Sequence, residues 1–549
     1  MSDLFVRKAT GLVRSWSVFD AFVYALFSIN LVTLGLYSFS QMYYLQGGLI
    51  PALLISALFI VFEVVVYAAL IAVMPRSGGD YVWQSRVLGG GIGFVLSITG
   101  WWFILWLWVP LYSDMLRHIV ITPLLGILGA KEAALWFGQS SLGLFVTALI
   151  TLALVSFYIM LGMKTYARIQ KICFYGGMLG LLIVIVLLLS GSPQAFKAGL
   201  ESNSIALFGA QPGVYDATVQ LGKDAGAALP MTGGSLGLIF LTLPYLVFFN
   251  LWPNWGATLY GEVRGATDFK RNFAGMAWAL GVTTLLAIIV IWAISRTIGW
   301  DFYTQANGAF WNYTWGYTTT APAFPVWPYP ALLAVFLTSN RLLQFIVVAL
   351  MSLWWFGWSG TVFLSSTRVI FAAAFDRLLP EKVAEIEPRT RTPLYALLMM
   401  VVPSIIVSYL FAYNYFNFRS ITLDSTLVIA VTYLGTAVAA ILLPYRKPEL
   451  YKASPIARYN IFGIPLITVA GVIFGGFLTF LLVEWLFDPW LNSQGVPPGL
   501  YGISLANTPS VIYIIIMYGL AAGIYYGFRT YRKNKGIDID KVHQEIPSE

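Results

Sequence analysis

The residues best suited to chemistry interrupt the sixth long apolar run of the sequence, at Asn250, Trp252, Pro253 and Asn254. Pro253 lacks a backbone N–H and its ring clashes with the preceding turn, so a helix kinks or ends there. The side-chain amides of Asn250 and Asn254 could bind the freed backbone groups or a polar solute. A cationic solute could stack on the Trp252 ring. The pattern predicts a solute-binding break in a helix, and a plain proline kink is the alternative.

A softer interruption lies in the first apolar run, at Ser28, Asn30 and Thr33. Polar residues this close together are unusual in a helix that faces lipid, where they bond to neighbouring helices instead. Irregular backbone at membrane depth occurs only where it is packed in protein or lines a wet cavity. We therefore expect these three side chains to bind polar groups of a solute, with bonding between helices as the alternative.

One acidic residue, Glu63, lies near the middle of the second apolar run, 49–74. An ionised carboxylate at that depth costs several kcal/mol, so intramembrane acids are protonated, paired or functional. Glu63 is therefore the best candidate for a proton carrier, and a structural hydrogen bond is the alternative. Asp114, Asp424 and Glu484 lie near the ends of their runs, where we expect an interfacial or solvated position.

The composition of the 549-residue chain predicts which kind of element holds these residues. Hydrophobic residues make up 59% of it and charged residues 10%, whereas soluble domains carry ~25% charged residues. A soluble enzyme of this size would lack the side chains to cover its surface. Runs that reach the roughly 20 residues of a membrane span occur near 17–39, 49–74, 91–115, 142–162, 168–190, 236–260, 273–296, 343–374, 393–413, 422–444, 461–486 and 509–529. The sequence thus predicts an all-α integral membrane domain with twelve transmembrane helices.

Few residues are available for enzymatic or metal chemistry. One Cys and two His exclude a disulfide framework and a multi-cysteine metal site. The P-loop, HExxH and GxSxG patterns are absent from the sequence, which argues against an enzyme. We expect no enzyme, no metal site and no cofactor other than a coupling ion.

Basic residues orient the chain in the membrane. With a cytoplasmic N-terminus, 25 of the 32 Lys and Arg residues fall in inner segments, as the positive-inside rule requires. We expect a multi-pass protein of the cell membrane with both termini cytoplasmic. The basic excess is then topological, and we expect no nucleic-acid partner.

Two outer loops are long. Residues 191–235 are rich in Gly and Ser, and residues 300–330 are crowded with aromatic side chains, which predicts either an interfacial belt or a lid over an outer vestibule. The expected order is a cytoplasmic N-tail (1–16), spans one to five (17–190), an outer loop (191–235), spans six to ten (236–444), spans eleven and twelve (445–529) and a cytoplasmic C-tail (530–549).

Several short motifs, in order, resemble those of the amino acid–polyamine–organocation (APC) superfamily. The resemblance implies a leucine-transporter fold, in which 17–190 and 236–444 form a five-plus-five inverted repeat and spans one and six unwind around the substrate. The matching stretches are Asp20-Ala21, Pro75-Arg76-Ser-Gly-Gly-Asp80-Tyr-Val, Gly162 to Arg168, Gly261-Glu262-Val-Arg264, Ser365-Ser366-Thr-Arg368 and Arg391-Thr-Pro393. Cytoplasmic gate or loop-anchoring roles would then fall to Asp20, Arg76, Arg168, Glu262 and Arg368.

The chain departs from this family in two places. The glycines that usually expose backbone amides to a substrate carboxylate are mostly absent from residues 30–35. The lysine that replaces a sodium ion in some members is absent from residues 174–178. Two coupling ions stay open: Na⁺ held by Ser365, Ser366 and carbonyls of span one, or H⁺ carried by Glu63.

Together these features predict a secondary active transporter that moves an amino acid or related small amine or organic solute by alternating access, as a symporter or antiporter. Its expected partners are the solute and the lipid bilayer, with the oligomeric state open. A non-transporting solute sensor or accessory membrane subunit with the same fold is the alternative, although the tail after Phe528 is short for an output module. A lipid-processing enzyme would need an acidic or histidine cluster, whereas the acids of loop 375–391 alternate with bases.

Overall fold

The computed structural model describes residues 16–390, 392–422, 424–487, 505 and 507–544. Within these residues, twelve helical segments are long and apolar enough to cross a membrane. The predicted all-α fold with twelve spans is therefore confirmed. Most of the N-tail, Arg391 of the last family motif, much of the segment between the final two spans and the end of the C-tail lie outside the described residues.

Several of the spans are built from more than one helical piece. Those pieces are: span one, α1 (Val18–Ile29), the π-helix η1 (Leu31–Gly35) and α2 (Leu36–Gln41); span two, α3 (Leu49–Val73); span three, α5 (Gly90–Ile98), the π-helix η2 (Thr99–Phe103), α6 (Leu105–Leu116), the π-helix η3 (Arg117–Ile121) and α7 (Thr122–Ile127); span four, α9 (Ser141–Met160); span five, α10 (Met163–Ser190); span six, α13 (Leu236–Asn250) and the 3₁₀-helix η4 (Trp255–Glu262); span seven, α14 (Phe269–Thr297); span eight, α17 (Arg341–Ser359) and α18 (Thr361–Phe375); span nine, α19 (Leu394–Ala412); span ten, α20 (Asp424–Arg446); span eleven, α22 (Leu466–Phe487); and span twelve, α24 (Thr508–Asn534).

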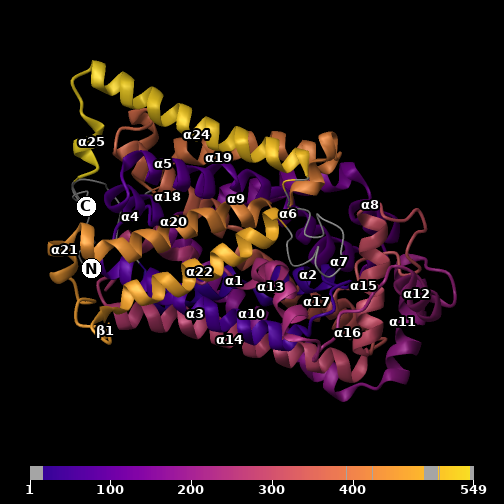
Figure 1. The fold of residues 1–549 in the computed structure, drawn as a ribbon. Coiled ribbons are helices and arrows are strands. Elements are labelled where there is room, and N and C mark those ends of the chain that lie inside the picture. Colours follow the sequence, from indigo (N-terminus) through magenta and orange to yellow (C-terminus); the bar gives the residue numbers. More distant parts are fainter. Residues whose placement is uncertain (1–15, 391, 423, 488–504, 506, 545–549) are drawn as a thin grey trace, which may run out of the picture.

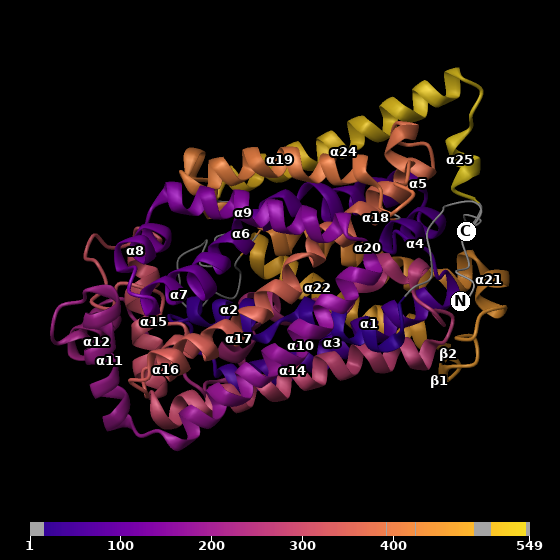
Figure 2. The ribbon, with the colours of Figure 1, turned by 180° about the vertical axis from the view of Figure 1, so that it is seen from behind.

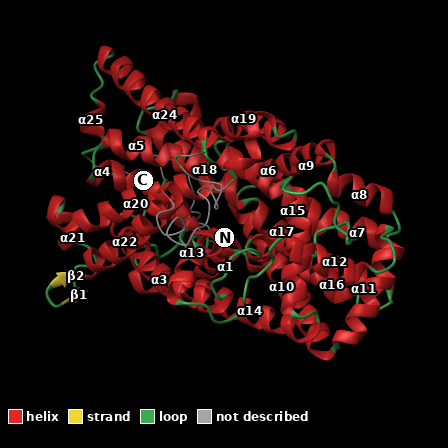
Figure 3. Ribbon diagram, turned by 45° about the vertical axis from the view of Figure 1, so that its right-hand side comes forward, coloured by secondary structure: helices red, strands yellow, loops and turns green. Residues whose placement is uncertain are grey.

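Short elements join the spans at both ends of the bundle. They are α4 (Asp80–Val87), α8 (Lys131–Gln139), α11 (Pro193–Phe208), α12 (Val214–Asp224), α15 (Trp300–Thr314), α16 (Pro330–Val335), the 3₁₀-helices η5 (Glu381–Ala384) and η6 (Tyr415–Ile421), α21 (Pro448–Lys452), the strands β1 (Asn460–Ile461) and β2 (Ile464–Pro465), and α25 (Ile539–Val542). The two strands pair antiparallel and form a small hairpin beside α21, and the rest of the described fold is helix and loop (Figure 3).

The spans lie alongside one another between two distinct ends (Figure 1). One end carries α4, α21 and α25, and we call it the termini end. The opposite end carries α8, α11, α12, α15 and α16, and we call it the loop end (Figure 2). The Gly/Ser-rich segment 191–235, expected as a loop, thus contains two helices.

Three elements surround the middle of span two. α3 packs against α13, α14 and α22. α1 packs in turn against α14, α10 and η4. Spans one and six therefore meet beside span two, and the acid of that helix lies inside the bundle.

Two spans differ from the predicted boundaries. Span three continues to Ile127 because π-helical turns carry it past the charged residues that were expected to end it. Span eight, which is too long for one straight crossing, is divided at Gly360 between α17 and α18.

Candidate substrate and coupling site

Span one is broken at Asn30, as the sequence predicts. Asn30 has a φ of 45°, a left-handed conformation that asparagine tolerates better than most residues. Its side-chain oxygen accepts a hydrogen bond from the Thr33 N–H at 2.9 Å, and its Nδ2 donates to the Trp354 carbonyl at 3.0 Å. The side chain therefore caps η1 and ties the break to span eight.

Span six is broken where the Asn–Pro segment interrupts it. α13 ends at Asn250, the next four residues are not helical, and η4 begins at Trp255. The two breaks touch, because a methyl group on Gly35 would lie 2.8 Å from the Phe249 ring. A glycine is required there for the backbone of span one to approach span six.

Polar atoms without partners remain at these breaks. The Thr33 hydroxyl and the Nδ2 atoms of Asn250 and Asn254 are buried and have no hydrogen-bond partner in the described structure. The amide oxygens are used, because Ser56 donates to Asn250 at 2.9 Å and Tyr433 donates to Asn254 at 3.1 Å. A buried donor without an acceptor costs about 1–3 kcal/mol, so these atoms indicate a place for a ligand.

Aromatic side chains line the break in span six. The Trp252 ring meets Trp108 edge-on at 5.3 Å and Trp255 at 5.4 Å, and its Nε1 donates to the Phe248 carbonyl. Ser28 differs from the other candidates, because its hydroxyl donates to a carbonyl of its own helix. Pro253 lies in the turn between α13 and η4.

A hydrogen-bonded latch joins spans one, six and eight on the termini side of the breaks. The Tyr24 hydroxyl donates to the Thr361 carbonyl at 3.1 Å and lies 2.9 Å from the Ser365 hydroxyl. Ser365 donates to the Trp255 carbonyl at 3.1 Å, whereas Ser366 bonds within its own helix. Both candidate sodium-binding serines therefore have protein partners here, and the sequence did not single out Tyr24 or Thr361.

A buried ion pair lies closer to the termini end. Arg368 donates to both carboxylate oxygens of Glu262, at 2.8 and 3.4 Å. The backbone at Glu262 and Arg264 binds Trp16, which lies just before α1: Trp16 N–H donates to the Glu262 carbonyl and Arg264 N–H to the Trp16 carbonyl. The pair thus fixes span eight to the end of span six, where a gate was expected.

The other three gate candidates lie on other elements of the chain. Asp20 forms a capping box with Ser17 at the start of α1 and binds Lys171 of span five at 2.8 Å. Arg76 is half-buried in the turn after α3, and Arg168 is exposed on α10. Asp20 therefore anchors span one to span five.

A second acid lies near Glu63. The carboxylate of Asp80, on α4, accepts hydrogen bonds from Tyr67 at 2.6 Å, Thr436 at 2.5 Å and Trp101 at 3.0 Å. Burial raises the pKa of Asp80 to about 6 although these donors oppose the shift. Glu63 interacts electrostatically with Asp80, and both of its oxygens lack a hydrogen-bond partner among the described residues. The sequence showed Asp80 only as part of a motif.

Tyrosines connect the two acids to the break in span six. The rings of Tyr67 and Tyr433 lie 5.5 Å apart, and Tyr433 donates to the Asn254 side chain. Asp80, Tyr67, Tyr433 and Asn254 therefore form one continuous cluster, with which Glu63 interacts electrostatically.

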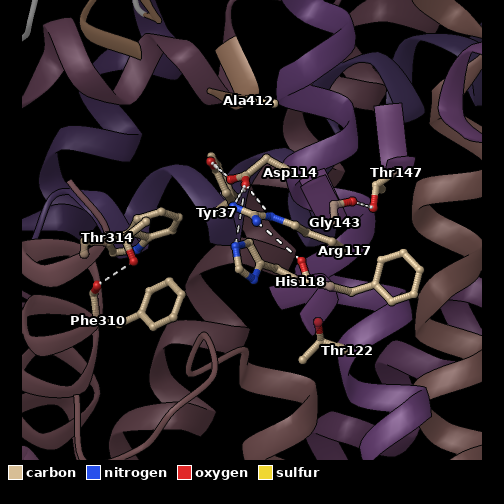
Figure 4. Close-up of polar contacts among 12 residues, drawn as sticks. Tyr37, Asp114, Arg117, His118, Thr122, Gly143, Thr147, Phe310, Thr314 and Ala412 are labelled. Atoms are coloured by element: carbon tan, nitrogen blue, oxygen red, sulfur yellow. Dashed lines mark hydrogen bonds and ion pairs between the residues drawn. The ribbon is translucent and has the colours of Figure 1, made fainter. Parts of the chain in front are cut away.

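A polar cluster joins spans one and three on the loop side of the breaks (Figure 4). Asp114 accepts a hydrogen bond from Tyr37 at 2.5 Å and forms an ion pair with Arg117 at 2.6 Å. The His118 ring lies 3.6 Å from the same carboxylate. The expected interfacial position of Asp114 is wrong, because span three continues past it and Tyr37 and Arg117 replace water around it.

The aromatic segment 300–330 covers this cluster. Trp311 is fully buried and donates to the Ser40 hydroxyl at 2.9 Å. Trp327 is buried as well and donates to Asn307 at 3.1 Å, and Phe310 lies edge-on to His118. These rings face protein rather than lipid, as a lid would.

The expected solvated positions of Asp424 and Glu484 are also wrong. Asp424 is buried at the start of α20 and accepts hydrogen bonds from Ser510 of span twelve at 2.7 and 2.8 Å. Glu484 is 3% exposed. Their position near the ends of apolar runs could not reveal which neighbouring helix covers them.

The two breaks are closed to solvent. The side chains of Asn30, Thr33, Asn250 and Asn254 are 0% exposed. A groove of about 860 Å³ lies elsewhere, between α24 and residues 380–382 at the termini end. A solute can therefore reach the breaks only after a conformational change.

Paired breaks in spans one and six are the arrangement that the family resemblance implied. The sequence matches the amino acid permease family over residues 17–521. The chain belongs to the amino acid permease family. No curated protein matches it significantly. The permease is thus a transporter rather than an enzyme, as predicted, and it is a multi-pass membrane protein for amino acids or related solutes.

Proposed function

We propose that the permease is a secondary active transporter in the cell membrane, with both termini cytoplasmic, that moves an amino acid or related small amine by alternating access coupled to H⁺ or Na⁺. The observation that carries this proposal is the set of unpartnered polar atoms on Thr33, Asn250 and Asn254, buried where spans one and six are both broken. The termini end is then the cytoplasmic side and the loop end the outer side.

The chemistry of the breaks suits a zwitterion. The free Nδ2 donors of Asn250 and Asn254 would bind a carboxylate in place of the glycine amides that the family usually offers. The Trp252 ring would face the substrate's ammonium group, because aromatic faces attract cations. Thr33 adds a hydroxyl that can donate or accept.

Contacts between the spans close this site on its inner and its outer side. On the inner side, the Tyr24 latch and the Glu262–Arg368 pair hold spans one, six and eight together. On the outer side, Tyr37 binds Asp114 of span three. Alternating access would open one closure while the other holds, so that the breaks never face both sides at once.

Exchange across liposomes tests the proposal. Purified protein is reconstituted into liposomes loaded with unlabelled proteinogenic amino acids, and entry of a labelled mixture of the same amino acids is followed. Wild-type protein should exchange label, and the double variant Pro253→Ala/Asn254→Ala should lose this counterflow while it still inserts. Asn460→Ala, in the exposed hairpin, is the matched control and should exchange normally.

Two results would contradict the proposal. Unchanged counterflow in the double variant would show that the break in span six is not the substrate site. If wild-type protein exchanges no amino acid but is thermally stabilised by one, as ligand binding requires, the chain is a solute sensor instead.

A further inference from the structure

We infer that the coupling ion of this permease is a proton, that Glu63 is the group that binds it, and that Asp80 is its exchange partner through Tyr67. The inference rests on the proposed transport and specifies its coupling. It starts from a geometric fact: Glu63 in the middle of span two and Asp80 at the start of α4 are both 0% exposed and interact electrostatically, and neither has a basic partner among the described residues.

The surroundings of Glu63 hold no group that could neutralise it. Asp80 and Tyr433 interact with it electrostatically, and Tyr67 lies one helical turn along the same face of α3. The basic residues of neighbouring helices lie near helix ends or are already paired. The charged and titratable groups on the elements that pack against α3 and α4 are Tyr245 (α13), Tyr260 and Glu262 (η4), Lys270, Arg271 and Arg296 (α14), Arg368 (α18), Asp424, Tyr433, Tyr445 and Arg446 (α20) and Glu484 (α22).

This environment favours a proton over a metal cation. A carboxyl group that is fully buried without a hydrogen bond or a counter-charge is stable only in its neutral form, because burial penalises the charged form. Neither Glu63 oxygen has a hydrogen-bond donor in the described structure, so no donor there stabilises its ionised form. A hard cation would need several further oxygen ligands around it, whereas a proton needs only the carboxyl group itself.

Asp80 is suited to the opposite role. Its two oxygens face three donors, the hydroxyls of Tyr67 and Thr436 and the indole N–H of Trp101, and donors aimed at a carboxylate stabilise its ionised form. They also occupy the positions that a cation would need. Burial meanwhile holds the pKa of Asp80 at about 6, so this carboxylate can gain and lose a proton near neutral pH.

Tyr67 connects the acids, and the proton balance closes. Its hydroxyl donates to Asp80, but Glu63 has no hydrogen-bond partner in this closed structure. Transfer therefore requires a change in conformation that brings Glu63 and Tyr67, one helical turn apart on α3, into contact. Tyr67 then gives its proton to Asp80 and takes the proton of Glu63, which leaves Glu63 ionised. A charge on Glu63 acts directly on Tyr433, which holds the Asn254 side chain at the break. Proton binding at Glu63 and substrate binding at Asn254 would therefore both act on Tyr433.

Glu63→Gln separates proton coupling from transport, because glutamine imitates a permanently protonated glutamic acid. The probe is the labelled mixture of proteinogenic amino acids in two assays: counterflow, which needs no net proton movement, and uptake into empty liposomes driven by an acidic outside. Glu63→Gln should lose accumulation above equilibrium while counterflow remains measurable, so that the ratio of accumulation to counterflow falls relative to wild type. Asp80→Asn should lose accumulation too, and Asp424→Asn, a buried acid outside this cluster, should keep both activities.

Three other outcomes would each refute a different part of the proposal. Accumulation by Glu63→Gln under the pH gradient would refute the role of Glu63. Accumulation that follows a sodium gradient and ignores pH would refute the proton while transport stands. Absence of both counterflow and accumulation in wild type would refute transport itself.

A spectroscopic measurement covers the case in which the variant is poorly active. The infrared spectrum of the purified protein should contain the carbonyl band of buried protonated carboxyl groups, and Glu63→Gln should remove the part of it that Glu63 contributes. Persistence of the whole band in Glu63→Gln would show that Glu63 is ionised and would overturn the inference.

Discussion

The hydrogen bond between Tyr37 and Asp114 joins spans one and three in the outer closure. Asp114 also binds Arg117 and lies near His118, but all three lie within span three, so these contacts do not hold span one. The Tyr37 hydroxyl crosses between the two spans and reaches the carboxylate at 2.5 Å. Tyr37→Phe removes this contact and keeps the ring, which packs edge-on against Trp311.

The size of the effect follows from the charge of the acceptor. A hydrogen bond to a charged group contributes about 1.5–3 kcal/mol. If opening of the outer side breaks it, Tyr37→Phe should raise the outward-open population about 10- to 150-fold. The variant has little effect on the fold, because Arg117 still neutralises Asp114.

Cysteine labelling measures this population. Cys173, the single cysteine of the chain, is buried and can be replaced by alanine. Ser38 on α2 is 1% exposed and its hydroxyl has no hydrogen-bond partner, so Ser38→Cys reports opening with little perturbation. Labelling by a membrane-impermeant maleimide tracks the open population as long as opening and closing are fast.

Tyr37→Phe should therefore accelerate labelling of Ser38→Cys by about one to two orders of magnitude. Tyr317→Phe, which alters a 76% exposed tyrosine, should not change the rate. Equal labelling rates with and without Tyr37→Phe would refute the assignment of this hydrogen bond to the closure.

Three further perturbations have defined outcomes. Arg368→Met leaves Glu262 buried without its partner and should destabilise the protein by about 3–5 kcal/mol. In thermal unfolding, the double variant Arg368→Met/Glu262→Gln should recover part of this loss. If it recovers none, the two residues are not a direct pair. Burial lowers the pKa of His543 to about 4 from its ordinary 6.5, so the undocked C-terminal segment takes up a proton first and docking weakens as pH falls from 6.5 to 4. The protection factors of the α25 amides, which correct hydrogen exchange for its intrinsic pH dependence, should fall over this range in wild type but not in His543→Gln. Gly35→Ala should lower the free energy of unfolding by about 1–3 kcal/mol through overpacking and should reduce counterflow. If the cause is the 2.8 Å approach of the new methyl group to the Phe249 ring, Phe249→Leu should restore both.

Features that depend on one stretch of chain could be predicted from the sequence. Twelve apolar runs gave twelve spans, because in lipid a helix must satisfy its own backbone. The breaks at Asn30 and Pro253 could be predicted for the same reason, since polar residues and proline interrupt a local pattern. Glu63 was recognisable because a mid-span acid conflicts with its apolar surroundings.

Features that depend on which helices meet could not be predicted. Tyr24, Tyr37 and Tyr433 look like ordinary aromatic residues of apolar runs, and their roles come from partners on other spans, such as Thr361 and Asp114. Asp80 lies outside the apolar runs and stood out only as part of a family motif, because its burial comes from the packing of α4 against α20. The burial of Asp424 by span twelve has the same origin.

The conformation of Asn30 also limits which residues evolution can place there. The position needs a residue that adopts a left-handed φ of 45°, an acceptor for the Thr33 N–H and a donor for the Trp354 carbonyl. Glycine meets the first condition only, and aspartate lacks the donor. In a saturation library selected for transport, this codon should thus be among the least variable of span one, with aspartate and glycine as the best-tolerated replacements and β-branched residues depleted most strongly.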